Sequence, residues 1–443
     1  MVMLKDRTDR WDPSKTYVIG HQRPDTDSIA SALGYAWFLE RTGDDSVVAA
    51  RAGQPGEQAI YALKRFEQSS PTLLTGVAPT FGHVASMQPF VRPDDPLPVA
   101  MARVAEGDRV VPVIDDDNRP VGIVTSLAVA RAYTAPMNMT AMLAQPCRVI
   151  SEIAPTLSHR DRILDHRTGL LRSETDDFLV VSESGEYLGV ATRRRILEPP
   201  RARLILVDHN ELSQAVNDAE EAEIVGVLDH HRLGNPPTAT PILFVVDPVG
   251  STSTLVAEKC RQHSLTPPRG IAGMLLSGML SDTLVFRSPT TTDRDRVAAV
   301  WLSEIAGVDI ETYGHELLRA QPGLGARSAG EVLDTDRKNY DFNGQSISVG
   351  QVEVTGLQEL PERRKELLEA LHDRLVREAL SFIALMVTDV VTGRSRLLCV
   401  GENWIVTALP FNHTVEGDYD LGEMVSRKKQ LVPTLMAIID ELR

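Results

Sequence analysis

Three short stretches of this sequence combine histidine with aspartate in a pattern that can bind divalent metal ions. They contain His21, Asp25 and Asp27, then Asp208-His209-Asn210-Glu211, then Asp229-His230-His231. An imidazole and several carboxylates at such short spacing include like charges that repel unless a cation compensates them. Histidine and carboxylate ligands without a thiolate suit manganese, with magnesium or zinc less favoured.

Each stretch directly follows an apolar run that is typical of a buried strand, at residues 17–19, 204–207 and 225–228. After Asp27, apolar residues recur at helical spacing as far as Gly43, which suits a helix C-cap. The first motif is therefore predicted on a turn between a strand end and a helix start, where ligands bind in open α/β sheets.

A fourth acidic position, Asp282, follows the apolar run at residues 274–280, which we interpret as another strand. The first motif alone has a simpler explanation, in which Asp27 caps a helix and His21 lies on the surface. The recurrence of an apolar run followed by Asp or His instead favours a metal site along one edge of a parallel sheet.

These motifs resemble those of the DHH phosphoesterases, and among them most closely the manganese-dependent family II inorganic pyrophosphatases. A late motif, Ser-Arg-Lys-Lys-Gln at residues 426–430, distinguishes that family from its DHH relatives. The resemblance implies an α/β fold in which a DHH-type parallel-sheet domain is interrupted by an insertion and followed by a C-terminal α+β domain. The expected parts are a catalytic domain at 15–75 and 203–320, an insertion at 76–202, a hinge at 321–330 and a substrate-binding domain at 331–443.

The resemblance also implies ligands and cofactors. Two or more Mn²⁺ or Co²⁺ ions are expected, with Mg²⁺ as a candidate companion of the substrate. Six residues would bind the metals: His21, Asp25, Asp27, His230, Asp208 and Asp282. Of these, Asp208 and Asp282 would be shared or flanking ligands. The predicted substrate is pyrophosphate. Two cations could share one water molecule, lower its pKa and hold the oxygen that attacks the phosphorus.

Four further residues are expected to act on the substrate or on a ligand. Asp229 would orient a ligating histidine, and His231 would donate to a phosphate oxygen. Arg427 and Lys428 would hold the phosphate when the two domains close.

The sequence departs from the family at two positions. Arg23 stands where the family usually has asparagine, and Arg319 aligns with a phosphate-binding lysine before the hinge. Arginine keeps the charge of lysine but differs in reach and geometry.

Two other functions remain open. One is another DHH phosphoesterase, such as an exopolyphosphatase, an oligonucleotide nuclease or a cyclic-dinucleotide hydrolase. The members that act on nucleic acids generally have a glycine-rich C-terminal domain that has no match here. The other is a catalytically silent nucleotide sensor, against which the complete set of metal positions argues.

The insertion contains an internal repeat. Residues 111–114 and 122–125 match residues 178–181 and 189–192, with Gly122 and Gly189 at an offset of 67 positions. Each copy is predicted to form two strands and then a helix. The repeat resembles a pair of CBS modules, which commonly bind adenine nucleotides in the cleft between copies.

A regulatory ligand of the insertion would be AMP, ADP, ATP or a diadenosine polyphosphate. Its candidate binding residues are Thr125, Thr192, Arg193 and Arg194. Nucleotide-binding copies usually carry an acid three residues after the threonine, whereas this chain has Ala128 and Arg195. A purely structural spacer is the alternative.

Composition restricts the partners. The net charge of −15, from 46 basic and 61 acidic residues, argues against an extended nucleic-acid surface. Three scattered cysteines do not indicate a disulfide framework, and neither a signal peptide nor a membrane span is recognised. We therefore expect a cytoplasmic protein, and the resemblance suggests a homodimer.

Overall fold

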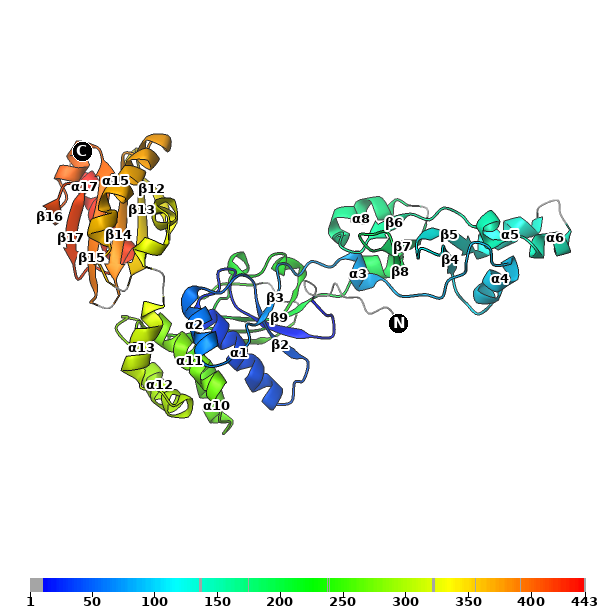
Figure 1. Ribbon diagram of the computed structural model, residues 1–443, viewed down its shortest axis with the longest axis horizontal. Coiled ribbons are helices and arrows are strands. Elements are labelled where there is room, and N and C mark those ends of the chain that lie inside the picture. The colour runs from blue at the N-terminus through cyan, green and yellow to red at the C-terminus, as the bar shows by residue number, and fades with distance from the viewer. Residues whose placement is uncertain are drawn as a thin grey trace.

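The computed structural model describes residues 11–134, 138–173, 175–236, 238, 240–320, 323–354, 356–390 and 392–441. We expected no signal peptide in the charged N-terminal stretch, which falls mainly on residues 1–10, outside this range. The chain forms a central α/β body, an elongated insertion and a C-terminal α+β body (Figure 1). Within the described part of the chain, no helix has the length and apolarity needed to cross a membrane.

The central sheet is parallel, with strand order β11-β10-β9-β1-β2-β3. Its strands are β1 (Thr16–Ile19), β2 (Val47–Arg51), β3 (Thr72–Leu73), β9 (Arg203–Val207), β10 (Glu223–Asp229) and β11 (Leu243–Val246). Because β1 pairs with β9 and β9 with β10, all in parallel, their carboxyl ends lie side by side. The three histidine–aspartate motifs therefore meet at one edge of the sheet, as predicted.

Helices cover one face of this sheet and form the largest core. They are α1 (Thr26–Arg41), α2 (Glu57–Arg65), α10 (Thr252–Gln262), α11 (Arg269–Asp282), α12 (Asp293–Ala306) and α13 (Ile310–Arg319). The other face is packed against Trp11, Val77 and the segment around Val216 and Ala219, which includes the 3₁₀ turns η1 (Leu212–Gln214) and η2 (Ala219–Glu221).

The prediction of a strand at residues 274–280 is wrong. These residues lie in helix α11, and Asp282 is the last residue of that helix. Every residue from Ile271 to Leu280 is buried, since α11 packs among α1, α10 and α12. A helix that is apolar on all sides lacks the periodicity that distinguishes it from a buried strand.

The insertion consists of two copies of the predicted strand–strand–helix unit. The first contains β4 (Val110–Ile114), β5 (Pro120–Thr125) and α5 (Ser126–Thr134). The second contains β7 (Asp177–Val181), β8 (Tyr187–Thr192) and α9 (Arg193–Leu197). The remaining elements of the insertion are α4 (Leu97–Ala105), α6 (Met139–Leu143), β6 (Thr156–Ser158) and α8 (Ile163–Leu171).

Each copy is completed by the segment that precedes the other copy. Helix α3 (Phe81–Val84) comes before the first copy, yet its apolar residues pack with Phe178 of the second. Helix α7 (Cys147–Ile150) comes before the second copy, yet Cys147 packs with Val124 of the first. The two copies therefore exchange segments and share one fold.

The C-terminal body is a mixed six-stranded sheet with order β12-β13-β14-β15-β17-β16. The strands are β12 (Lys338–Phe342), β13 (Gln345–Val354), β14 (Phe382–Asp389), β15 (Arg394–Gly401), β16 (Asn412–Val415) and β17 (Asp418–Gly422). Helices α14 (Ala329–Asp334) and α15 (Leu360–Arg377) contribute to the core on one face. Helices α16 (Asn403–Thr407) and α17 (Val432–Glu441) pack on the other.

The structure describes most of the expected hinge and corrects one local prediction beyond it. The expected hinge at 321–330 contains the 3₁₀ turn η3 (Leu324–Ala326) and the start of α14, because Ser328 and Glu331 form a capping box. Residues 321 and 322 of that hinge lie outside the described range. The expected loop with Arg427 and Lys428 is a π-helical turn, η4 (Arg427–Leu431), that continues into α17.

The contact between α1 and α11 leaves no room for a side chain at Gly34. A Cβ atom there would lie 2.5 Å from Cδ2 of Leu275, a side chain that is itself fully buried. Gly34→Ala should therefore lower the free energy of unfolding of the central body by about 1–3 kcal/mol through overpacking.

Chemical denaturation of the full chain measures this effect. The control is Gly330→Ala in α14, where no atom lies within 4 Å of the added Cβ and about 0.4–1 kcal/mol of stabilisation is expected. Equal stability of the two variants would contradict the close packing of α1 on α11.

Candidate metal centre

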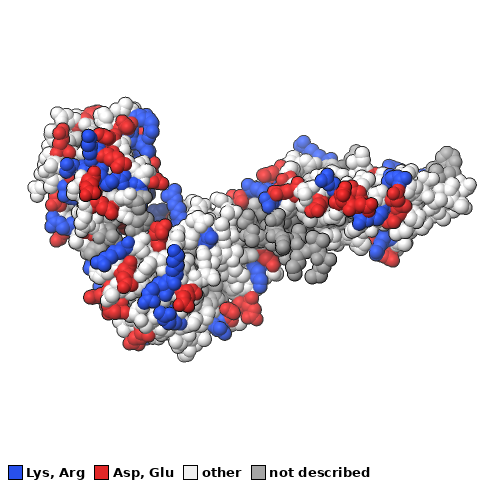
Figure 2. All heavy atoms as spheres, viewed as in Figure 1, with Lys and Arg blue, Asp and Glu red and all other residues white. Residues whose placement is uncertain are grey.

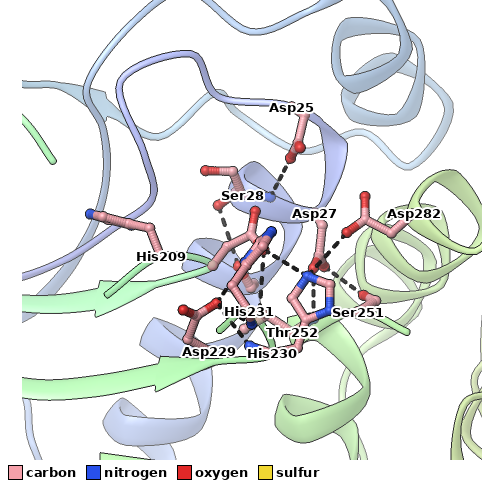
Figure 3. A network of polar contacts seen from close by, with 12 residues as sticks. Asp25, Asp27, Ser28, His209, Asp229, His230, His231, Ser251, Thr252 and Asp282 are labelled. Atoms are coloured by element: carbon pink, nitrogen blue, oxygen red, sulfur yellow. Dashed lines mark hydrogen bonds and ion pairs between the residues drawn. The ribbon is translucent and has the colours of Figure 1, made fainter. Parts of the chain in front are cut away.

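The ends of three strands, the start of α1 and the end of α11 carry the candidate ligands (Figure 3). His21 follows β1, Asp208 follows β9 and His230 follows β10. Asp25 is the N-cap of α1, and its Oδ1 accepts a hydrogen bond of 2.9 Å from the amide of Ser28. The helix cap is thus Asp25, whereas the simpler explanation assigned this role to Asp27, which lies inside the first turn of α1.

The six predicted ligands form two groups that share Asp208. One group is His21, Asp25 and Asp208, and the other is Asp27, Asp208, His230 and Asp282. Within each group, one candidate ligand atom per residue lies within 4.8 Å of the others. Asp208 directs its two oxygens to different groups: Oδ2 lies 3.4 Å from Nε2 of His21, and Oδ1 lies 3.4 Å from Nε2 of His230.

The donor atoms in these groups fit a divalent cation. Nδ1 of His230 lies 3.0 Å from the carbonyl oxygen of Val249, which can only accept, so Nδ1 carries the hydrogen and Nε2 is available as a ligand. Nε2 of His230 and Oδ2 of Asp208 are both buried without a hydrogen-bond partner. A cation would satisfy both atoms, and nitrogen with carboxylate oxygen is a donor set that manganese accepts.

Charge in this centre is strongly unbalanced. Burial alone would lower the pKa of His21, but Asp208 and Asp25 outweigh it and raise the pKa to about 11. Burial is likewise outweighed at His230, whose pKa rises to about 12 because of Asp208 and Asp282. Burial and the charge of Asp208 raise the pKa of Asp27 to about 7. The carboxylates thus draw positive charge into a site that two imidazoles alone do not neutralise.

Asp229 and His231 form a unit beside the metal groups. Oδ1 of the fully buried Asp229 lies 2.9 Å from Nδ1 of His231 and also accepts the backbone amides of His230 and His231. The ring that Asp229 orients is therefore that of His231, whereas we expected a ligating histidine. The hydrogen bond with Asp229 raises the pKa of His231, which widens the pH range over which both ring nitrogens carry a hydrogen.

Several buried groups of this centre received no role from the sequence. His209 is buried beside His21, and burial lowers its pKa to about 4. Asn210 donates its side-chain amide to Asp229. Ser251, Thr252 and Ser253 surround Asp27 at the start of α10. His209 and Asn210 belong to the second motif, whereas the signal for Ser251 to Ser253 was a run of hydroxyl residues after Gly250, which resembles an ordinary helix start.

The predicted substrate-binding cations are not brought to the metal centre in this structure. Arg427 and Lys428 lie in η4 of the C-terminal body, which Figure 1 shows beside the central body instead of over its sheet. Arg427 is only 4% exposed and pairs with Asp336 at 3.1 Å, while Lys428 is exposed. Arg319 is exposed at the end of α13, next to the connection between the two bodies.

In the insertion, most of the predicted nucleotide-binding groups make internal contacts. The hydroxyls of Thr125 and Thr192 accept backbone amides at the starts of α5 and α9. Arg193 donates to the carbonyl oxygens of Ser173 and Thr175 and pairs with Asp176. A pocket of about 300 Å³ is lined by Arg109, Asp176, Arg193, Arg194, Leu197 and Glu198.

Comparison with known proteins extends over the whole chain. Residues 15–279 match the N-terminal domain of the DHH family, and residues 315–438 match the DHHA2 domain. A Streptococcus agalactiae protein that bears the name of a manganese-dependent inorganic pyrophosphatase is 38% identical over 255 residues, which are 56% of this chain and 82% of that protein. A Streptococcus suis protein of the same name is 40% identical over equal shares.

A crystal structure of a candidate family II inorganic pyrophosphatase from Methanococcus jannaschii is also similar. It is 26% identical, with a TM-score of 0.54, and the match covers 96% of this chain and 99% of that one, so it includes the insertion. The family-model matches and the curated relatives agree with the site geometry. The chain belongs to the DHH family and, within it, to the manganese-dependent family II inorganic pyrophosphatases.

Proposed function

We propose that this protein hydrolyses inorganic pyrophosphate to two phosphates with two or more Mn²⁺ or Co²⁺ ions. The observation that most supports the proposal is the position of Asp208, whose two oxygens face two separate groups of ligand atoms. A carboxylate shared in this way is the arrangement that a two-metal centre requires. Bound there, divalent cations would lower the pKa of a water molecule and neutralise phosphate oxygens.

His231 is placed to bind the substrate from the protein side. Its Nδ1–H is fixed by Asp229, and its side chain is 53% exposed, so Nε2 can reach an incoming phosphate oxygen. Because its pKa is raised by Asp229, Nε2 carries a proton over a wider pH range and can donate to that oxygen. Asn210 and the backbone amides of residues 230 and 231 keep Asp229 in position.

The C-terminal body would supply further positive charge by closing over the sheet edge. Lys428 is exposed and available for a phosphate. Arg427 is paired with Asp336 and also donates to the carbonyl oxygen of Val349. Asp336 thus occupies one face of the Arg427 guanidinium, while its Nε has no hydrogen-bond partner among the described residues. Phosphate binding at Nη2 would replace Asp336, which acts as a stand-in anion until then.

Asp208→Asn should lower the rate of phosphate release from pyrophosphate by more than about 100-fold, since it removes the charge that both metal groups share. Asparagine tolerates the left-handed backbone at this position, where φ is 62°, so the fold should remain intact. The assay is run with saturating Mn²⁺ and in parallel with Co²⁺, Mg²⁺ and Zn²⁺. Asp309→Asn, at the exposed start of α13, is the control with unchanged rate. Near-normal turnover of Asp208→Asn would refute the shared-ligand assignment.

Lys428→Ala should raise the KM for pyrophosphate and leave Mn²⁺ affinity unchanged, because the residue lies on the C-terminal body and away from the metal groups. Steady-state kinetics and a metal titration measure the two quantities. Lys365→Ala on α15, also exposed, is the matched loss of charge. A weaker metal site with normal KM would show that η4 has another role.

We further propose that the insertion regulates turnover by binding adenine nucleotides. Ala128 and Arg195 have no carboxylate to offer to ribose hydroxyls. Ala128 is buried, and Arg195 donates a hydrogen bond to Ser86. The pocket beside Arg109 and Arg194 instead favours phosphate groups. We therefore expect weak adenosine binding and a preference for ligands with several phosphates. A homodimer is also expected, which light scattering can measure.

A specific contact can transmit the state of the insertion to the metal centre. Arg162 of the insertion lies 2.9 Å from Asp218 and 2.6 Å from Glu221. These two acids belong to the segment that follows Asp208, and in the same segment Gln214 accepts the backbone amide of Gln22, next to His21. Nucleotides can act through this connection only if they bind two arrangements of it unequally.

AMP or ADP should lower the activity of the intact enzyme, and ATP or a diadenosine polyphosphate should raise it. In Arg162→Met, the ratio of the activity with nucleotide to the activity without it should move towards one. Calorimetry should still detect nucleotide binding to this variant. Arg160→Met, which removes an ion pair with Glu183 inside the insertion, is the matched control.

Replacing residues 76–200 by a short linker should retain turnover and abolish the response. Absence of any nucleotide binding would reduce the insertion to a spacer. A response that survives the deletion would place the effector at the active site.

A further inference from the structure

Asp27 is held by an unusually complete set of hydrogen bonds. Its Oδ1 accepts from Ser251 Oγ at 2.7 Å, from Ser253 Oγ at 2.5 Å and from the Ser253 amide at 3.0 Å. Its Oδ2 accepts only from the amide of Thr252, at 2.6 Å. All four residues have no exposed surface, so water does not compete for these bonds. We call the two serine hydroxyls the hydroxyl clamp.

The hydroxyl clamp cannot easily move away from Asp27. The amide of Gly250 and the hydroxyl of Thr254 donate to the buried Asp295, which fixes the start of α10 from the other side. A Cβ atom on Gly278 would lie 2.7 Å from Oδ1 of Asp27 and 2.5 Å from Oγ of Ser253, so α11 closes the remaining space. The carboxylate is therefore confined in both position and orientation.

Saturation of one oxygen limits how Asp27 can bind a cation. An ionised carboxylate has about four lone-pair positions on its two oxygens. Oδ1 already accepts three hydrogen bonds, and Oδ2 accepts one. Only Oδ2 retains the capacity for a metal, so Asp27 can be a ligand through one oxygen but not through both.

We propose that the hydroxyl clamp of Ser251 and Ser253 makes Asp27 an obligate one-oxygen ligand and thereby selects octahedral ions such as Mn²⁺ over Ca²⁺. Ca²⁺ takes about six to eight oxygen ligands and often binds both oxygens of a carboxylate, whereas smaller ions of this charge accept octahedral sites. The inference rests on the proposed metal centre, and Ser251 and Ser253 act on it as positioning residues through Asp27.

The experiment measures Mn²⁺ and Ca²⁺ binding to the metal-stripped full-length protein by calorimetry, without substrate. Ser251→Ala and Ser253→Ala, singly and together, remove hydroxyls and keep the two backbone donors. The Mn²⁺ Kd should rise about 10–100-fold, as is typical when support of a metal ligand is lost. The Ca²⁺ Kd should rise less or fall, because Oδ1 becomes available, so the Mn²⁺ preference should shrink.

Ser277→Ala is the control, since Ser277 is equally buried but contacts Gly273 and Tyr313 instead of the metal centre. Both Kd values should stay unchanged in it. The selectivity proposal would be overturned if the Kd values for Mn²⁺ and Ca²⁺ rose equally in the clamp variants. It would also be overturned if the Mn²⁺ Kd of these variants equalled that of the wild type.

The single variants carry the same test if the double variant does not fold. Their Mn²⁺-induced rise in melting temperature gives a second readout. Absence of pyrophosphate turnover by the wild-type protein would instead refute the proposed function. That result is independent of the metal-binding comparison.

Discussion

Mutual repulsion among carboxylates at one sheet edge is the constraint on which this structure depends. Asp27, Asp208 and Asp229 are almost fully buried within the same centre, and Asp282 lies beside them. Burial of unpaired charge is strongly unfavourable, so each carboxylate needs donors or cations. The parallel sheet brings imidazoles from two strand ends, and the start of α10 supplies amides and hydroxyls. The remaining negative charge is what makes the edge a cation site.

The sequence predicted the parts of this centre whose signals are local. The ends of β1, β9 and β10 could be recognised because short β-branched runs stop directly at Asp or His. Asp282 lies in one of the two groups of candidate ligands, but the sequence placed it after a strand, since α11 is apolar all round. The hydroxyl clamp could not be predicted, because Ser251 and Asp27 are separated by 224 positions and meet only through tertiary packing. The burial of Arg427 against Asp336 depends on packing in the same way.

The candidate metal ligands, the candidate phosphate-binding cations and the insertion lie on three different bodies of the chain. Ligands and the oriented His231 belong to the central body, while Arg427 and Lys428 belong to the C-terminal body. Lysine and arginine are interspersed with acidic residues over the visible face, without an extended basic stripe (Figure 2). The insertion contacts the segment after Asp208 through Arg162, which pairs with Asp218 and Glu221, and through the amide of Val77, which donates to the carbonyl oxygen of Asn217.

The exchange of segments within the insertion limits how this chain can have evolved. A chain that lost one copy would keep the short helix that packs against that copy. Phe81 and Val84 in α3, or Cys147 in α7, would then lose the apolar surface that buries them. Deletion of half of the module would therefore expose apolar side chains on the half that remains. The two copies must be inherited, acquired or discarded as one unit.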